Sequence, residues 1–155
     1  IAVRARDVTR QYCRAKEILF CLKLGQDFPN CSVNPLEIQQ VFVNLIYNAV
    51  DASVRGARID ARLEQIEDSI VFEIEDWGHG ISDHNLGRVF DPFFTTRQQT
   101  GGTGLGLSIV HGIVHHHKGR IEVRSKEGRG TIVRASFPIC REGTTQAVAA
   151  SAGAS

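Results

Sequence analysis

Residues 101–112 read GGTGLGLSIVHG, and four glycines stand within the first six positions of this stretch. The apolar run that follows predicts a helix over about 104–117. Glycines directly before a helix expose backbone N–H groups at the positive end of the helix dipole, and such a segment can bind an anion. No Lys-Ser or Lys-Thr pair follows and no strand runs directly into the glycines, which excludes a P-loop and a dinucleotide fingerprint. The alternative is a flexible turn in front of a helix.

The whole chain has the composition of one globular domain: 155 residues, 42% hydrophobic and 23% charged, with a net charge of +1. Without a basic excess we expect no nucleic-acid partner. No apolar run approaches the roughly 20 residues of a membrane span, and no signal peptide is visible. We therefore expect no direct membrane contact, reduced cysteines and a cytoplasmic location. Because Ile1 opens a chain without methionine, we interpret it as a fragment of a longer protein.

Hydrophobic periodicity predicts the order of the secondary structure elements. Helices are expected at 3–17, 36–53 and 104–117, and strands at 18–24, 57–64, 69–76, 119–125 and 131–137. The strand at 18–24 reads as a buried strand, and KEGRG at 126–130 reads as a hairpin turn. The irregular stretch from about 78 to 102 is too long for an ordinary connection, which indicates a functional or mobile segment. This order predicts one sheet with helices on one face.

The expected helix at 36–53 carries an apolar stripe and, beside it, a polar row formed by Asn44, Asn48 and Asp51. Asparagine is unusual inside a helix because it prefers caps and turns. Amide oxygens suit a magnesium ion, which shares its oxygen ligands with phosphates. The alternative is a solvated helix face.

Asp76 has the same parity as Ile70, Phe72 and Ile74, so its carboxylate should point to the core side where the strand ends. A buried carboxylate needs a partner, and a nucleobase amine would serve. Gly78 and Gly80 would let a flat ring lie close to the backbone. The alternative is a turn in which Asp76 only caps the chain.

The segment RVFDPFFTTR (88–97) holds three phenylalanines in a predicted loop, where exposure is unfavourable. We expect them to pack as the anchor of a mobile cover, from which Arg97 could reach a terminal phosphate. The alternative is a small satellite core with a solvated arginine. The histidines at 111 and 115–117 lack further metal ligands at suitable spacing, so we expect them to suit the helix C-terminus, with Gly119 at its end.

Four stretches stand in a fixed order: NLIYNAVDA (44–52), DWGHGI (76–81), FDPFFTT (90–96) and GGTGLGLSIV (101–110). They resemble the asparagine box, first glycine box, phenylalanine box and second glycine box of bacterial sensor histidine kinases, over about residues 16–138. The resemblance implies the α+β fold shared by gyrase, the ninety-kilodalton chaperone, histidine kinases and mismatch-repair ATPases. This fold is a two-layer α/β sandwich with a left-handed crossover. A mixed sheet of about five strands is covered on one face by about three helices, with an ATP lid.

The resemblance also implies roles for single residues. Asn48 would hold magnesium, with Asn44 one turn earlier, where gyrase-type ATPases carry a glutamate that activates water. Asp76 would bind the adenine amine, followed by Gly78, Gly80 and Ile81. Asp51 stands where some relatives have lysine or arginine facing the phosphates, and Trp77 is expected to cover the rim of the site. The remaining implied nucleotide-binding residues are Phe90, Thr95, Thr96, Gly102, Thr103, Gly104, Leu105, Gly106 and Leu107, and Arg97 is the implied catalytic residue that neutralises the terminal phosphate.

By this resemblance the chain is a protein-histidine kinase domain that binds Mg-ATP and donates the terminal phosphate to a histidine on a separate helical hairpin. A receiver-domain aspartate of a response regulator would take the phosphate next. No histidine here has the setting of that acceptor, so residues 1–15 would join a missing dimerisation and phosphoacceptor hairpin. Residues 16–140 would form the catalytic domain, and 141–155 a disordered tail. The alternatives are an ATPase of the same superfamily, a non-catalytic nucleotide-sensing module, and an unrelated α/β domain with glycine-rich turns.

Overall fold

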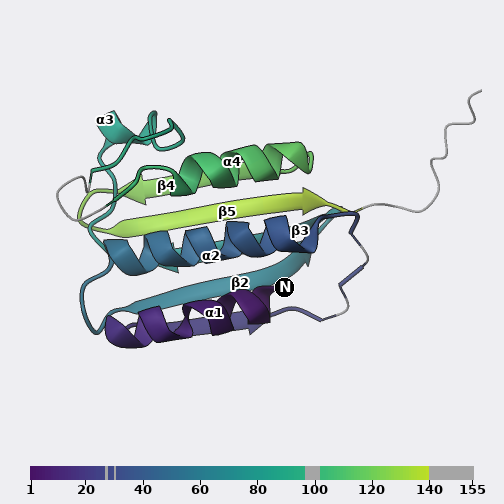
Figure 1. The fold of residues 1–155 in the computed structure, drawn as a ribbon, viewed down its shortest axis with the longest axis horizontal. Helices are drawn as coiled ribbons and strands as arrows, with labels where there is room; N and C mark the ends of the chain where they lie inside the picture. Colours follow the sequence, from purple (N-terminus) through teal and green to yellow (C-terminus); the bar gives the residue numbers. More distant parts are fainter. Residues whose placement is uncertain (27, 30, 97–101, 140–155) are drawn as a thin grey trace, which may run out of the picture.

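The computed structural model describes residues 1–26, 28–29, 31–96 and 102–139. Arg97, Gly101 and the expected disordered tail at 141–155 lie outside these residues. A five-stranded sheet forms one layer, and α1, α2 and α4 cover one of its faces (Figure 1). The described elements are α1 (Ala2–Ala15), β1 (Leu19–Leu24), α2 (Pro35–Ala52), β2 (Arg58–Ile66), β3 (Ser69–Asp76), α3 (Asp83–Leu86), α4 (Gly106–His116), β4 (Arg120–Lys126) and β5 (Gly130–Pro138). The predicted α+β sandwich with a mixed sheet is confirmed.

The strands lie in the order β1-β2-β3-β5-β4. β1 and β2 are parallel, because α2 returns the chain to the same end of the sheet before β2 begins. The other three pairs, β2–β3, β3–β5 and β4–β5, are antiparallel. The predicted hairpin turn joins β4 to β5, with Gly128 and Gly130 at φ +74° and +102°. β3 is therefore the middle strand. Its last residue, Asp76, lies at the end of the strand from which the chain continues toward α3.

The apolar stripe of α2 forms the centre of the core, as its spacing predicts. All six predicted stripe residues are buried: Ile38, Val41, Phe42, Leu45, Ile46 and Ala49. Phe42 stacks on Phe72 of β3, with ring centroids 4.0 Å apart. The helix begins at Pro35, and the side chain of Asn34 caps it by accepting a hydrogen bond from the Leu36 N–H at 3.0 Å. This packing fixes the polar row of α2 relative to the end of β3.

The expectation that residues 18–24 form a buried strand is wrong. Among the described strands β1 lies at the edge of the sheet and pairs with β2 alone, and Leu19 and Leu24 are 59% and 47% exposed. An apolar run does not distinguish a central strand from an edge strand, because both bury one face against the helices. The neighbouring strands decide how much of the run remains in contact with water.

The second face of the sheet carries charge instead of helices. Glu73 of β3 has a side chain only 6% exposed, and it is paired with Arg62 of β2 at 2.8 Å and with Arg134 of β5 through Nε at 2.8 Å. Both arginines remain partly exposed. The buried carboxylate of Glu73 is therefore satisfied by its two arginines on a face that no described helix covers.

His117 ties the C-terminal end of α4 to the N-terminal end of α2. Its Nδ1 donates to the Ile113 carbonyl at 2.9 Å, and its Nε2 accepts from the Asn34 N–H at 3.0 Å. These partners require the neutral tautomer with the proton on Nδ1.

The expectation for Gly119 at the end of α4 needs a correction: Lys118 takes the left-handed conformation (φ +56°) after the helix. Gly119 is required for packing, since a Cβ there would lie 2.3 Å from the Ser136 carbonyl oxygen.

Within the part of the chain that the structure describes, no helix combines the length and hydrophobicity that a bilayer span requires. Cys13, Cys21 and Cys31 form no disulfide within the part of the chain that the structure describes. Cys140 lies outside the described residues.

Candidate functional site

A cavity of about 450 Å³ opens between the C-terminal half of α2, the end of β3, the segment 79–96 and the first turn of α4. This volume is in the range of small-molecule sites. It brings together most of the residues singled out from the sequence. Those that line it are Asn44, Asn48, Asp51, Asp76, Gly80, Ile81, Thr95, Thr96, Gly102, Thr103, Gly104, Gly106 and Leu107. Gly78, Phe90 and Leu105 are not among its described lining residues.

Asn44 and Asn48 lie one turn apart on α2 and both face the cavity. The Nδ2 atom of each is buried, and neither has a hydrogen-bond partner among the described residues. A buried amide without a partner costs free energy, so two of them on one cavity wall indicate a place for a polar ligand. Gly106, at the start of α4, is the nearest neighbour across the cavity: a Cβ there would lie 3.5 Å from both Oδ1 and Nδ2 of Asn48.

Asp76 is 5% exposed and closes the cavity beside the last turn of α2. Its Oδ1 accepts a hydrogen bond from the Gly78 N–H at 2.9 Å. Burial raises the pKa of this carboxyl from 3.8 to about 6, even though the backbone of Gly78 and Thr131 and the nearby His79 act in the opposite direction. An acidic group held this far from water suits a ligand that brings its own hydrogen-bond donor.

The loop after β3 is held by close backbone packing. A Cβ at Gly78 would lie 2.1 Å from the Ala52 carbonyl oxygen, and one at Gly80 would lie 2.1 Å from the Lys126 carbonyl oxygen. Gly80 also has φ +67°. These two glycines are therefore required for the loop to lie against α2 and β4. The interpretation that they admit a flat ring stays a prediction.

Ser125 of β4 is a supporting residue that sequence reasoning missed. Its Oγ accepts from the Ile81 N–H at 2.8 Å, donates to the Gly130 carbonyl at 2.8 Å, and lies 2.9 Å from the Thr131 hydroxyl. It thereby ties the loop after β3 to the β4–β5 hairpin. Thr131 and Glu127 of that hairpin also face the cavity. Alternation along 131–137 places Thr131 on the core face, but only the strand order places this hairpin beside Asp76.

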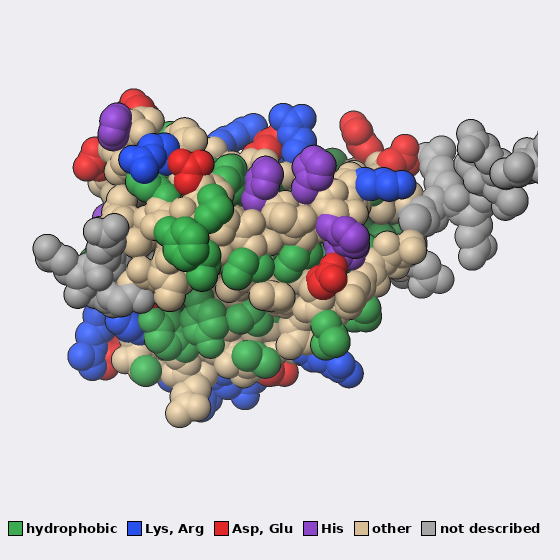
Figure 2. Space-filling model, turned by 45° about the horizontal axis from the view of Figure 1, so that its top comes forward, with side chains coloured by type: hydrophobic (Ala, Val, Ile, Leu, Met, Phe, Trp, Pro, Cys, Tyr) green, Lys and Arg blue, Asp and Glu red, His purple; other side chains and the backbone are tan. Residues whose placement is uncertain are grey.

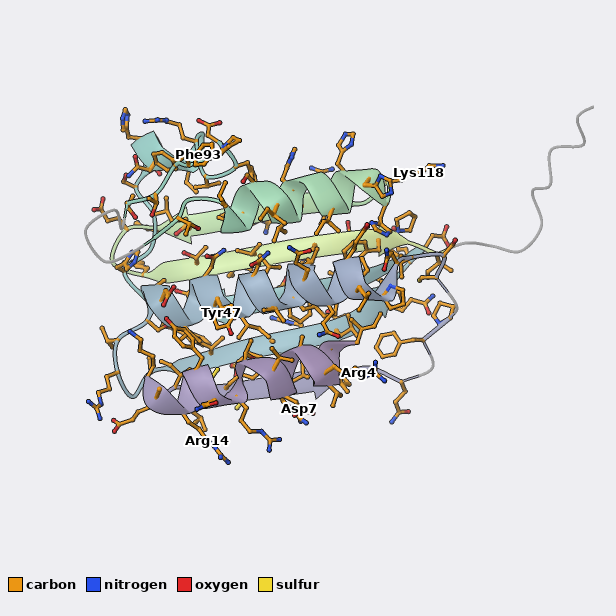
Figure 3. The ribbon with its side chains drawn as sticks, in the orientation of Figure 1. Arg4, Asp7, Arg14, Tyr47, Phe93 and Lys118 are labelled. Atoms are coloured by element: carbon orange, nitrogen blue, oxygen red, sulfur yellow. The ribbon has the colours of Figure 1, made fainter. Side chains whose placement is uncertain are left out.

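The segment expected to act as a lid is joined by its backbone to the residues just before α4. The Phe93 N–H donates to the Gly104 carbonyl at 3.0 Å, and a Cβ at Gly104 would lie 2.4 Å from the Phe93 carbonyl carbon. Phe93 itself is 71% exposed with φ +65°, so its side chain is not the expected anchor. Figure 3 shows Phe93 in the segment that follows α3. In the space-filling view of Figure 2, hydrophobic and histidine side chains are exposed on one side of the molecule.

The other two phenylalanines of this segment do pack. Phe90 lies against His111 of α4, with ring centroids 5.0 Å apart. Phe94 faces the cavity and is covered by the Arg88 guanidinium, 4.5 Å above the ring centre. Phe90 is thus a support behind the site and does not line it. Trp77, expected to cover the rim of the site, is exposed and is not among the described lining residues of the cavity.

The charged side chains on the described cavity wall are Asp51, Asp76 and Glu127, with His79 beside them, and no lysine or arginine is among these residues. Asp51 accepts a hydrogen bond from the hydroxyl of Tyr12, which lies on α1. The polar row of α2 is therefore confirmed as one wall of the cavity, but its carboxylate is engaged by the neighbouring helix.

The sequence matches the family described as histidine kinase-, DNA gyrase B-, and HSP90-like ATPase over residues 33–141. The chain belongs to this family. Within the family it is similar to sporulation kinase E of Bacillus subtilis (31% identity over 134 residues, 86% of this chain and 18% of that protein). It is also similar to the alginate biosynthesis sensor protein KinB of Pseudomonas aeruginosa (34% identity over 125 residues, 81% and 21%). The chain thus spans about a fifth of the length of these relatives.

Solved structures show the same likeness. The nucleotide-free catalytic domain of histidine kinase ThkA superposes with a TM-score of 0.78 at 28% identity, covering 88% of this chain and 89% of that one. The mycobacterial sensor histidine kinase MprB gives a TM-score of 0.74 at 27% identity, covering 88% and 91%. The chain is accordingly an ATP-binding domain of the sensor histidine kinase type.

Proposed function

We propose that this domain binds Mg-ATP in the cavity and presents the terminal phosphate for transfer to a histidine on another domain. The observation that carries the proposal is the pair of buried Nδ2 atoms of Asn44 and Asn48, which have no hydrogen-bond partner among the described residues. They share the cavity with the first turn of α4 and with the buried carboxylate of Asp76 at the end of β3. This arrangement offers a polar phosphate end and a base-binding end in one cavity.

At the base-binding end, Asp76 would accept a hydrogen bond from the exocyclic amine of adenine. The Gly78 N–H donates to its Oδ1, and because each carboxylate oxygen can accept more than one hydrogen bond, the group can still accept one from a ligand. Ile74 and Val133 line the cavity beside it and give the ring an apolar surface. Ser125 and the close packing of Gly80 hold the loop, so the acceptor is positioned before the ligand arrives.

At the phosphate end, Asn48 would hold the magnesium ion through its amide oxygen, and Asn44 would add a second polar group. The ion, when bound, supplies positive charge to the phosphate oxygens. The free N–H groups of the first turn of α4 would face the same oxygens. Thr95, Thr96, Gly102, Thr103, Gly104, Leu105, Gly106 and Leu107 would close over the triphosphate, and Arg97 would neutralise its terminal charge.

An asparagine at position 44 favours transfer over hydrolysis. A neutral amide cannot take a proton from water, so Asn44 supplies no general base at the position where gyrase-type ATPases carry a glutamate. The nucleophile would then come from outside, as a histidine on a helical hairpin joined to α1. A response-regulator receiver domain would accept the phosphate next, on the cytoplasmic side where ATP is available.

The binding step is tested by calorimetry with Mg²⁺ and a non-hydrolysable ATP analogue. Asp76→Asn should weaken binding roughly 10- to 100-fold, since the amide N–H₂ would face the adenine amine donor to donor. Glu75→Gln, one residue earlier on the same strand, is the matched control and should bind normally. Unchanged binding by Asp76→Asn would contradict the base-binding assignment. Steady ATP hydrolysis by the domain, abolished by Asn44→Ala, would favour the ATPase alternative over the kinase.

A further inference from the structure

We propose that Tyr12 is a positioning residue that draws the Asp51 carboxylate toward α1 and away from the phosphate end of the cavity. Affinity for the charged part of a nucleotide would then depend on where α1 lies relative to α2. This inference rests on the proposed function and deepens it, because it names a control on the same site. Its starting point is one hydrogen bond between two helices, from residues 39 positions apart in the chain.

Asp51 continues the row of Asn44 and Asn48 and lies three residues beyond the proposed magnesium ligand. Residues three apart on a helix are neighbours, with their Cβ atoms about 5–6 Å apart. A carboxylate at this position can therefore turn toward the phosphates or away from them. In the structure its Oδ1 accepts the Tyr12 hydroxyl, and a hydrogen bond to a charged acceptor is a strong one.

The ring of Tyr12 is itself held in place. Tyr47 packs edge-on against it from α2, with ring centroids 4.9 Å apart and planes at 76°, and the Lys16 ammonium lies 6.0 Å from its centre. Figure 3 shows Tyr47 on the side of α2 that faces α1. α1 and α2 pack directly against each other. The position of the Tyr12 hydroxyl relative to Asp51 therefore depends on where α1 lies against α2.

The charge of the cavity makes this contact matter. Its described wall carries the carboxylates of Asp51, Asp76 and Glu127 and neither lysine nor arginine. A triphosphate brings several negative charges, and repulsion between partly buried charges is only weakly screened by salt. Asp76 is committed to the base-binding end, so Asp51 is the carboxylate of the α2 row whose direction affects the phosphates. Held by Tyr12, it bounds the site without facing them.

The consequence is a mechanical link between α1 and the nucleotide. A shift of α1 along α2 would break the hydrogen bond and let the carboxylate turn inward. Under the proposed function α1 joins the phosphoacceptor hairpin, so movement of that hairpin would change phosphate affinity while leaving the adenine contact unchanged. This coupling predicts that loss of the Tyr12 hydroxyl weakens binding of a charged triphosphate but not of uncharged adenosine. A merely structural role of Tyr12 does not predict this difference.

The test measures affinity for two ligands, Mg²⁺ with a non-hydrolysable ATP analogue and adenosine alone, in the unaltered chain and in Tyr12→Phe, Asp51→Asn and the double variant. Tyr12→Phe should weaken the triphosphate on the order of tenfold and leave adenosine unchanged. In the Asp51→Asn background the same change should have no effect on either ligand. Asp7→Asn, which removes one exposed carboxylate from α1, is the matched charge control and should leave both affinities unchanged.

Urea unfolding without nucleotide provides a second readout. The effects of Tyr12→Phe and Asp51→Asn should be non-additive there, because both remove the same hydrogen bond. Equal weakening of both ligands by Tyr12→Phe, an unchanged triphosphate affinity, or the same loss in the Asp51→Asn background would overturn the inference while leaving the proposed function intact. If the unaltered chain binds neither ligand, the proposed function itself fails and the inference with it.

Discussion

The buried carboxylate of Asp76 should lower the free energy of unfolding of the domain at neutral pH, and Asp76→Asn should remove this destabilisation. The carboxyl is 5% exposed, and burial raises its pKa from 3.8 to about 6. At 1.36 kcal/mol per pKa unit, this shift corresponds to about 3 kcal/mol of unfolding free energy. The cost is borne by a group that the proposed function assigns to adenine, so stability and binding should respond to the substitution in opposite directions.

The sign follows from proton linkage. The folded state binds the proton more tightly than the unfolded state, so the contribution of Asp76 is fully present below pH 3.8 and is lost as the pH rises through about 6. Asparagine cannot ionise and keeps an oxygen for the Gly78 N–H. The difference in unfolding free energy between Asp76→Asn and the unaltered chain should therefore shift by about 3 kcal/mol in favour of the variant between pH 3.5 and pH 8.

The assay is urea unfolding followed by circular dichroism at several pH values and constant ionic strength, without nucleotide. Other carboxyl groups titrate equally in both proteins, so their effects cancel in the difference. Asp83→Asn replaces an exposed aspartate of α3 and should give a nearly constant difference across the same range. A difference for Asp76→Asn that stays constant from pH 3.5 to pH 8, or that shifts against the variant, would refute the argument that this carboxylate is buried at an energetic cost.

Three further perturbations test the supports of the site. Ser125→Ala removes the acceptor of the Ile81 N–H and two further hydrogen bonds, and it should cost about 1–3 kcal/mol in urea unfolding with faster hydrogen exchange at the Ile81 amide. Gly104→Ala puts a Cβ at φ +67° against the backbone of Phe93 and should lower the free energy of unfolding by at least about 1–2 kcal/mol. Gly87→Ala, with open space and φ −67°, is the control and should be neutral or slightly stabilising. Limited proteolysis of the lid should likewise be faster for Gly104→Ala than for Gly87→Ala. Glu73→Ala leaves two partly exposed arginines without their carboxylate and should lower the free energy of unfolding by about 1–3 kcal/mol at pH 7. High salt should reduce this loss. No change in thermal unfolding would show that the ion pairs contribute nothing.

Local patterns were sufficient to predict every described strand, the three longer helices and much of the cavity wall, but not the short helix α3 (Asp83–Leu86) within the stretch expected to be irregular. The stripe from Ile38 to Ala49 predicted α2 within a residue at each end, because an amphipathic helix of this length has one apolar face to bury. The parity of Asp76 predicted a buried carboxylate at the end of β3, because alternation along a strand is strictly local. The row of Asn44 and Asn48 followed from helical geometry in the same way.

Local patterns were not sufficient where the outcome depends on which segments become neighbours. The apolar run of β1 was expected to be buried, and only the strand order makes it an edge. Phe93 was expected to anchor the lid, but its backbone bond to Gly104 turns the side chain outward. The supporting role of Ser125 depends on the β4–β5 hairpin lying beside the loop after β3, and no spacing in the sequence encodes that proximity.

The sequence alone determined the class of domain, the order of its strands and longer helices and most of the described residues that line the cavity, since these depend on periodicity and on short motifs in a fixed order. Only the tertiary structure decided how those residues are held. It paired Asp51 with Tyr12, packed Gly78 and Gly80 against distant backbone, and brought three carboxylates from separate elements into the lining of one cavity. Contacts of this kind join residues far apart in the chain, and their energies come from burial and charge that exist only after the layers have packed.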